Sequence, residues 1–152
     1  MQTGFSILEL LVVLVVLGVL LGIGVTVVRP PAATVYSNDV RALIQQARFE
    51  AIKRNVPVAI RWDAEGMGFV AGLGPVDDPC AIVDVVARAA TDAYPRVVVD
   101  PGFPEGDGLV WLPSGQARAC DYGTFVQTIA YVEDGRVERE ITVTLTGRVT
   151  IQ

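Results

Sequence analysis

The sequence contains no histidine in its 152 residues. Histidine is the commonest general base near neutral pH and a frequent metal ligand, so both roles lack their usual side chain. Serine is scarce as well: the chain has only Ser6, Ser37 and Ser114. Ser114 stands in a Pro-Ser-Gly turn, where serine is ordinary turn chemistry, and neither a P-loop nor a GxSxG motif occurs. We therefore expect a protein that is not an enzyme and uses no cofactor.

Positive charge is outnumbered, and the net charge is −5. This balance excludes a molecule that binds nucleic acid through its overall charge.

Acidic side chains gather in two loops, at Asp77 and Asp78 and at Asp100, Glu105 and Asp107. Oxygen-rich loops hold Ca²⁺ in some proteins. The D-x-[DN]-x-[DN]-G order of a calcium loop is absent here. Solvated loop charge is the favoured interpretation, and no metal site is expected.

Residues 5–28 form one apolar run, about 36 Å long as a helix, which is enough to cross a bilayer. An ordinary signal peptide has a basic start and a shorter apolar core, whereas the leader MQTG carries no basic side chain. A simple membrane anchor fits the length but leaves Glu9 unexplained. A carboxylate inside a bilayer costs a few kcal/mol unless it is paired.

The stretch GFSILELLVVLVVLGVLL resembles the N-terminal signature of type IV pilins and type II secretion pseudopilins. The resemblance implies that residues 1–4 are a leader, that prepilin peptidase cuts between Gly4 and Phe5, and that the Phe5 amine is then methylated. Residues 5–29 would form a transmembrane helix and filament-core segment. The protein would cross the bacterial inner membrane once, with residues 30–152 in the periplasm or outside the cell. The implied partners are other pilins or pseudopilins, the prepilin peptidase, the inner-membrane assembly platform and membrane lipid.

Glu9 has a role in this interpretation. Cleavage exposes an α-amine at Phe5, whose reference pKa near 8 makes it mostly cationic at neutral pH. In a filament of staggered helices, Glu9 of one subunit would pair with the Phe5 amine of another and so fix the axial register. The alternative is that Glu9 reaches a lipid headgroup or stays protonated.

Pro30 and Pro31 end the apolar run, because proline removes backbone donors and disfavours helix for the preceding residue. Within the run, Gly18, Gly22 and Gly24 weaken the helix by about 1 kcal/mol each relative to alanine. The alternative is that the glycines allow helices to pack closely, since Gly18 and Gly22 have the small-xxx-small spacing of such contacts.

The next segment predicts an amphipathic helix over about 34–55, capped by Ser37 or Asn38 and ended by Asn55. Its apolar positions recur at three- and four-residue steps: Val40, Leu43, Ile44, Ala47, Ala51 and Ile52. We expect this face to pack on a sheet. The alternative is that part of it packs against neighbouring subunits.

After Pro57 the apolar period changes from 3.6 to 2, which predicts strands. The predicted strands are 58–63, 67–73, 82–88, 96–99, 109–112, 124–132, 137–145 and 148–151. The sequence Glu-Asp-Gly-Arg at 133–136 predicts a hairpin turn, since glycine supplies the positive φ, and 146–147 predicts another. The expected fold is α+β: a long N-terminal helix followed by an antiparallel, β-sandwich-like sheet domain.

The C-terminal segments LVWLPSGQARAC and TVTLTGRVTIQ look like the GspH/FimT-like branch of minor pseudopilins and pilins. In that branch a Pro-x-Gly turn, here residues 113–115, follows a hydrophobic strand, and a Gly-Arg pair, here Gly147 and Arg148, begins the last strand. The resemblance implies a non-catalytic subunit that is assembled into, or caps, a type IV pilus or a type II secretion pseudopilus.

The resemblance places Cys80 and Cys120 outside the cytoplasm, where an even pair of cysteines favours one disulfide. Two buried free thiols are the alternative. Cys80 and Cys120 are 40 positions apart, which matches no zinc or redox CxxC motif.

Two further functions stay open. Some FimT-like pilins serve DNA uptake, but in residues 134–152 three arginines are balanced by three acidic residues, so DNA or secreted cargo is a minor expectation. The second open function is that of a membrane-anchored binding domain that never polymerises.

Overall fold

The computed structural model describes residues 6–27, 30–75, 77–104, 106–120 and 128–152, although not the side chains of residues 22–27. The chain divides into two compact units, Met1–Pro30 and Pro31–Gln152, which are taken separately below. Gly4 and Phe5, the predicted cleavage site, lie outside the described residues.

The first unit contains helix α1 (Ile7–Val27), within the apolar run where a helix is predicted. The Ser6 hydroxyl caps its start by accepting a hydrogen bond from the Leu8 N–H at 3.3 Å. The side chains described in α1, residues 7–21, are all exposed. When only the described residues are counted, no helix is both long enough and apolar enough to qualify as a membrane span.

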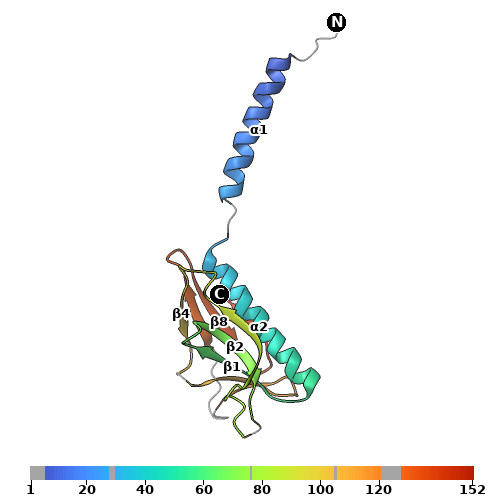
Figure 1. Ribbon diagram of the computed structural model, residues 1–152, viewed down its shortest axis with the longest axis vertical. Helices are drawn as coiled ribbons and strands as arrows, with labels where there is room; N and C mark the ends of the chain where they lie inside the picture. The colour runs from blue at the N-terminus through green and yellow to red at the C-terminus, as the bar shows by residue number, and fades with distance from the viewer. Residues whose placement is uncertain (1–5, 28–29, 76, 105, 121–127) are drawn as a thin grey trace. The chain divides into compact units, whose positions relative to one another are not determined.

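The second unit begins with helix α2 (Ala32–Arg54), which runs along the sheets (Figure 1). Asn55 ends the helix as predicted, in the left-handed conformation with φ 54°. The predicted cap at Ser37 or Asn38 is wrong, because the helix already begins after Pro31. Ser37 lies inside the helix, fully buried, and donates to the Ala33 carbonyl at 2.7 Å.

A residue from far along the chain binds the start of α2 instead. The Ala33 N–H donates to Asp134 Oδ2 at 3.1 Å. Asp134 belongs to the predicted 133–136 turn, which the structure confirms, with Gly135 at φ 77°. Its other oxygen, Oδ1, accepts from the N–H groups of Arg136 and Val137. One carboxylate therefore joins the hairpin to the helix.

In the described part of the chain, nine strands form two antiparallel sheets. The five-stranded sheet has the order β3-β2-β1-β5-β6 and the four-stranded sheet the order β4-β7-β8-β9. The strand bounds are β1 Val58–Asp63, β2 Gly68–Leu73, β3 Asp84–Ala90, β4 Val98–Pro101, β5 Gly108–Trp111, β6 Ala117–Ala119, β7 Thr128–Glu133, β8 Glu138–Val143 and β9 Val149–Ile151. The predicted α+β class with antiparallel sheets is confirmed for this unit.

Strand boundaries differ from the prediction in places. The pattern does not predict β6, whose three residues are too few to show a period of two. Strand β3 begins two residues later than predicted, because Ile82 is still in a turn, with its N–H donating to the Cys80 carbonyl at 2.9 Å. Residues 124–127 of the predicted strand 124–132 lie outside the described residues.

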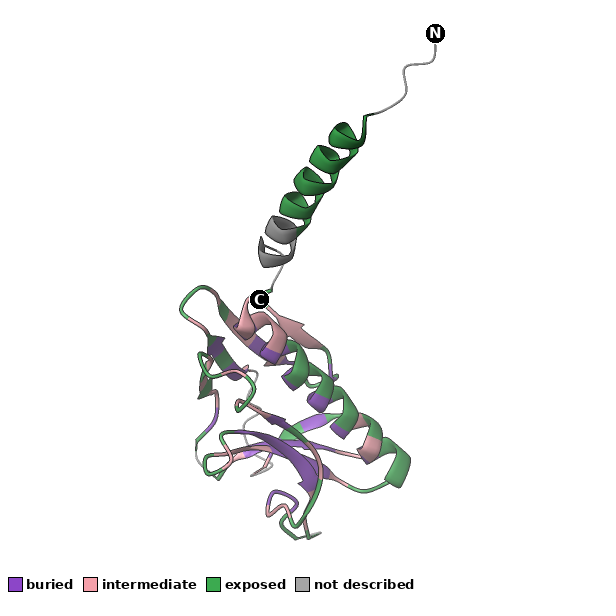
Figure 2. Ribbon diagram, turned by 45° about the horizontal axis from the view of Figure 1, so that its top comes forward, coloured by how far each residue is buried: buried purple, intermediate pink, exposed green. Residues whose placement is uncertain are grey.

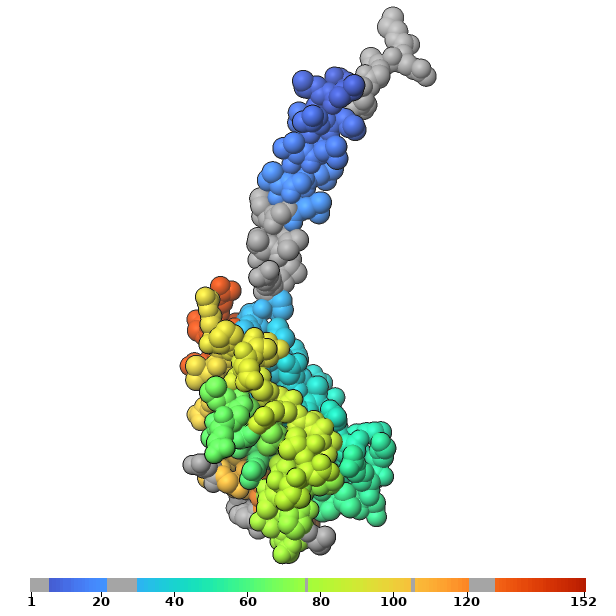
Figure 3. All heavy atoms as spheres, viewed as in Figure 1, coloured from blue at the N-terminus to red at the C-terminus, as the bar shows by residue number. Residues whose placement is uncertain are grey.

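The core lies between α2 and both sheets. Figure 2 shows the buried stripe of α2 facing the strands, and Figure 3 shows the β3 region packed beside the helix. The helix contributes the fully buried Tyr36, whose hydroxyl donates to the Ala89 carbonyl at 3.1 Å. Ile52, predicted on the buried face, is 51% exposed. Ala51 is the last buried residue of α2, and Ile52 follows it on the exposed side of the helix.

Asp134 yields a prediction about acid stability. The hydrogen bond from the Ala33 N–H, assisted by those from Arg136 and Val137 and opposed by desolvation, holds the pKa of the Asp134 carboxyl below its ordinary value. Because the folded-state pKa is the lower one, Asp134 stabilises fully above the unfolded pKa of about 3.9 and loses this effect as pH falls through the folded pKa. We expect Asp134→Asn to be less stable than wild type at pH 7, with the gap closing below about pH 4.

Urea unfolding at a series of pH values measures the gap. Glu133→Gln is the control, because Glu133 is exposed and lies opposite Glu138 in the β7–β8 pair. It should not be less stable than wild type, since it relieves a like-charge pair. An Asp134→Asn gap that stays constant down to pH 2 would contradict the carboxylate's role.

Candidate functional site

A polar groove of about 650 Å³ lies between helix α2 and strand β9. We call it the α2–β9 groove and define it by six of its lining residues: Thr34, Asn38, Arg41, Gln45, Arg139 and Arg148. The four from α2 follow one another at steps of three and four residues. They therefore form one stripe of the helix, beside the stripe that enters the core.

Arginine dominates this groove. Arg41 and Arg148 are exposed, and Arg139 is half-buried with its Nε 3.5 Å from Thr34 Oγ1. The ion pairs found among the described residues are Glu50–Lys53, Glu50–Arg54 and Asp63–Arg88. None of them includes an arginine of the groove, so an anionic group is the chemistry that these three side chains would bind.

The groove continues into a smaller apolar cavity of about 290 Å³, with Trp111 and Phe49 among its lining residues. Gln45, Gly147 and Val149 line both hollows. Between the two ends, the Arg48 guanidinium lies over the buried Trp111 ring at 5.4 Å and donates to the Gly147 carbonyl at 3.3 Å. Arg48 therefore ties α2 to the turn that leads into β9.

Two glycines of the sequence signature meet at Arg48. Gly147 has φ +87°, and a Cβ there would lie 2.7 Å from Arg48 Nη1 and 2.9 Å from Trp111 Cη2. Gly115, in the Pro-x-Gly turn, has φ +78°, and its Cβ would lie 3.4 Å from Arg48 Nη2. Both glycines belong to turns that the sequence predicts. Arg48 is not predicted, although its spacing from Arg41 and Gln45 places it on the same stripe of the helix.

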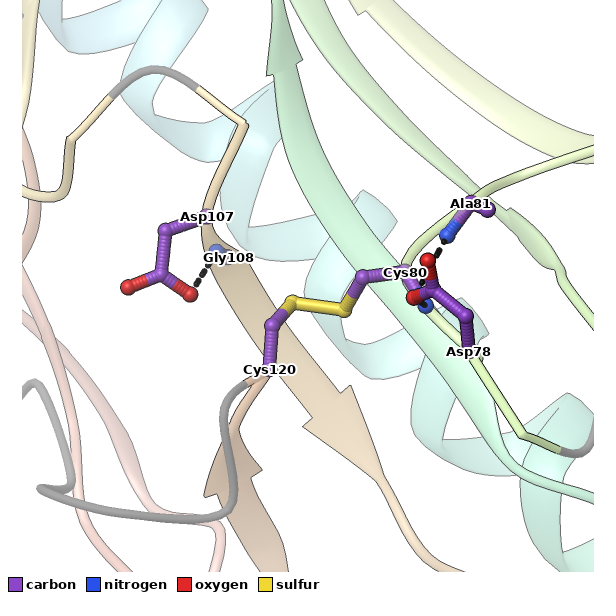
Figure 4. The surroundings of a disulfide bond; sticks show 6 residues. All are labelled: Asp78, Cys80, Ala81, Asp107, Gly108 and Cys120. Atoms are coloured by element: carbon purple, nitrogen blue, oxygen red, sulfur yellow. Dashed lines mark hydrogen bonds between the residues drawn. A yellow bond between two sulfur atoms is a disulfide. The ribbon is translucent and has the colours of Figure 1, made fainter.

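Two of the acidic loop residues, Asp78 and Asp107, accept hydrogen bonds from the backbone. Asp78 Oδ1 accepts from the N–H groups of Cys80 and Ala81, each at 3.2 Å, and Asp107 Oδ1 accepts from the Gly108 N–H at 2.7 Å (Figure 4). Glu105 lies outside the described residues. Within the described part of the chain, no three acidic or cysteine side chains gather as a set of metal ligands.

The structure bonds Cys80 to Cys120 as a disulfide, with a Cα–Cα distance of 5.8 Å (Figure 4). Cys80 belongs to the loop between β2 and β3, and the Cys120 N–H donates to the Gly108 carbonyl at the start of β5. Around the bond, Ala59 and Val110 form a small second cluster of buried residues with Cys80. The bond therefore joins the β2–β3 loop to the β5–β6 end of the five-stranded sheet.

Fold and surface together define a class of protein: an N-terminal apolar helix followed by an α+β domain whose helix packs against two antiparallel sheets. Residues 37–151 match the family described as Type II transport protein GspH. This match covers well over half of the chain, and the protein therefore belongs to that family of type II secretion pseudopilins. The matched region leaves out Gly4, Phe5 and Glu9. No curated protein and no solved structure matches the chain.

The contact at Gly147 predicts an unequal cost for two glycine substitutions. Gly135→Ala meets no atom within 4 Å and should cost only the backbone strain of a positive φ, about 1–2 kcal/mol. Gly147→Ala carries similar strain and also crowds Arg48 and Trp111, so we expect about 2–5 kcal/mol. Chemical unfolding of both variants measures the difference. Equal costs would show that the contact with Arg48 and Trp111 has no energetic weight.

The disulfide predicts the thiol content of the mature protein. Labelling of denatured, unreduced protein should find no free thiol, and replacing both cysteines by alanine should lower the free energy of unfolding by roughly 2–4 kcal/mol. Two labelled thiols per chain would reject the bond.

Proposed function

We propose that this chain is a minor pseudopilin: a non-catalytic subunit that is assembled into, or caps, the pseudopilus of a type II secretion system. The observation that carries the proposal is the family match over residues 37–151. The unmatched N-terminal part supplies a separate argument, because its sequence resembles a prepilin signature. The expected partners are other pseudopilins, the prepilin peptidase and the inner-membrane assembly platform.

The proposal assigns the two units different tasks. Residues 5–28 would cross the inner membrane and later enter the filament core, which accounts for their nearly continuous apolar character. Residues 31–152 would lie outside the cytoplasm, a location that suits the Cys80–Cys120 bond because disulfides persist in oxidising compartments.

Glu9 is the assembly residue of this proposal. It lies in the first turn of α1, and its side chain is exposed. An exposed carboxylate on an otherwise apolar helix needs a cation once the helix enters an apolar surrounding. The α-amine created at Phe5 of a neighbouring subunit is that cation. Pairing also fixes axial register, which apolar side chains alone do not specify.

Mass spectrometry of the mature protein tests the processing step. We expect a chain that begins with N-methylated Phe5 and lacks residues 1–4. Replacing Gly4 by a bulky residue should leave the precursor in the membrane uncut, since the peptidase requires the small side chain. An intact leader in the wild-type protein, or a cut beyond residue 20, would overturn the proposal.

Glu9→Val tests the pairing. The substitution removes a carboxylate from the apolar run, so membrane insertion should be no worse. The stability of residues 31–152 should not change, because Glu9 belongs to the other compact unit. Incorporation into detergent-extracted filament complexes should fail, because the partner's Phe5 amine is left unpaired.

Ser6→Ala serves as the control, since it lies one turn from Glu9 and removes only a helix cap. Normal incorporation of Glu9→Val into the shaft of the filament would refute the pairing. Absence of the wild-type protein from the filament complexes would favour an anchored domain that does not polymerise.

A further inference from the structure

Among the strands that the structure describes, β9 is one edge of the four-stranded sheet. The Gln152 N–H donates to the Glu140 carbonyl at 3.0 Å, the Glu140 N–H donates back at 3.1 Å, and the Thr144 N–H donates to the Arg148 carbonyl at 3.0 Å. In an antiparallel ladder, hydrogen-bonded pairs alternate with pairs that are not bonded to each other. The main-chain N–H and C=O groups of Val149 and Ile151 therefore point away from β8, toward the open edge.

The α2–β9 groove lies along this edge and brings three arginines to it. Arg41 comes from α2, Arg139 from β8 and Arg148 from the turn before β9. Among the described residues no carboxylate lies within ion-pair distance of any of them. Although the net charge of the chain is −5, three arginines that have no ion-pair partner within the described residues lie beside the edge strand.

The far end of the groove is apolar and exposed. Phe49 is 62% exposed and Ile52 is 51% exposed. Phe49 and Ile52 line the smaller cavity into which the groove continues. Side chains of this kind in solvent cost hydrophobic free energy, roughly 25 cal/mol per Å² of apolar surface left uncovered. A ligand that covers the whole surface therefore presents negative charge at one end and apolar groups at the other.

We propose that the α2–β9 groove binds an extended acidic segment of a partner protein, which adds as a strand to β9. Main-chain groups of the segment bond to those of Val149 and Ile151, and its carboxylates meet Arg41, Arg139 and Arg148. Its apolar side chains cover the end of the groove formed by Phe49 and Ile52. The proposal rests on the proposed function only in taking the partner to be another subunit of the filament.

A peptide fits these features better than a nucleic acid does. An open strand edge offers alternating donors and acceptors at the spacing of a second strand, which is how sheets recruit peptides. At the apolar end, Phe49 and Ile52 suit an apolar side chain, and the Arg48 guanidinium there already lies over Trp111 and is bonded to the Gly147 carbonyl. The protein's net charge of −5 also opposes a long polyanion, whereas a short acidic segment feels mainly the local arginines.

Fluorescence anisotropy with the full mature chain in neutral detergent tests the proposal. The probe is a labelled peptide of alternating glutamate and valine, eight residues long; the matched probes replace glutamate by lysine, or methylate every second main-chain nitrogen. A single-stranded oligodeoxynucleotide is the fourth probe. We expect saturable binding of the glutamate peptide alone, weakened by added salt.

Variants locate the site. Arg41→Gln and Arg148→Gln should each weaken binding about two- to fivefold, as expected for partly solvated ion pairs, and the double variant about four- to twenty-five-fold, because independent effects multiply. Arg118→Gln is the matched control, since Arg118 is an exposed arginine on β6 that does not line the groove. Thermal unfolding of each variant checks that the fold is retained, and it should be, because both groove side chains are exposed.

Several results would overturn the proposal: equal binding of the glutamate and lysine peptides, an Arg118→Gln loss as large as that of Arg148→Gln, or unchanged binding of the N-methylated peptide. Binding of the oligonucleotide alone would assign the groove to nucleic acid. Self-association in sedimentation velocity that Arg148→Gln abolishes would assign it to a second copy of this chain. Processing at Gly4 and Phe5 is read from the mass of the mature protein, so failure here leaves the proposed function standing.

Discussion

The packing of helix α2 onto both sheets is the contact on which the rest of the domain depends. Its buried stripe includes Ala33, Ala47 and Ala51, each with no exposed surface, so the helix backbone lies close to the strands. The two sheets consequently share one hydrophobic core rather than forming separate layers with cores of their own. Tyr36 adds a directional contact, because its buried hydroxyl is bonded to β3.

Helix α2 contributes to both the core and the α2–β9 groove. Its period of 3.6 residues places neighbouring stripes of side chains about a quarter turn apart. One stripe fills the core, and the next lines the α2–β9 groove. Arg48 lies where they meet, over Trp111 and bonded to the Gly147 carbonyl. The conformation of the turn before β9 therefore depends on the helix, and so does the position of the open strand edge that the groove follows.

The same geometry gives the glycine signature a physical meaning. Gly115 and Gly147 lie 32 positions apart in the sequence, yet both turn the chain at positive φ beside one guanidinium. A side chain at Gly147 would contact both the guanidinium and the Trp111 ring. At Gly147, the glycine of the Gly-Arg pair is thus required to leave space for Arg48 and Trp111.

Much of the fold follows from the sequence, because long periodic segments carry their own signal. The helix that ends at Asn55, the period-two strands and the 133–136 turn are all predicted from local pattern. What fails is what depends on distant partners. Ser37 satisfies every local rule for a cap, but Asp134 binds the helix start from a hairpin about one hundred residues away.

The candidate site is less predictable for the same reason. Gly147 and Arg148 are identified by resemblance to a family, and the cysteines by their even number. The groove is not foreseen, since Arg41 and Arg139 come from segments nearly a hundred residues apart and become neighbours only in the fold. A balance of charge along residues 134–152 also hides the fact that the acidic Glu138 projects from the outer face of the sheet while Arg139 turns toward α2.

Amide hydrogen exchange of residues 31–152 tests most directly whether one core, organised by α2, unites the two sheets. The amides of residues 43–51 in α2 should exchange at the same slow rate as those of β1 and β7, because opening the helix exposes the core of both sheets. A single free energy should govern all three segments. Exchange of the helix amides well ahead of both sheets, or two separate free energies for β1 and β7, would contradict this account.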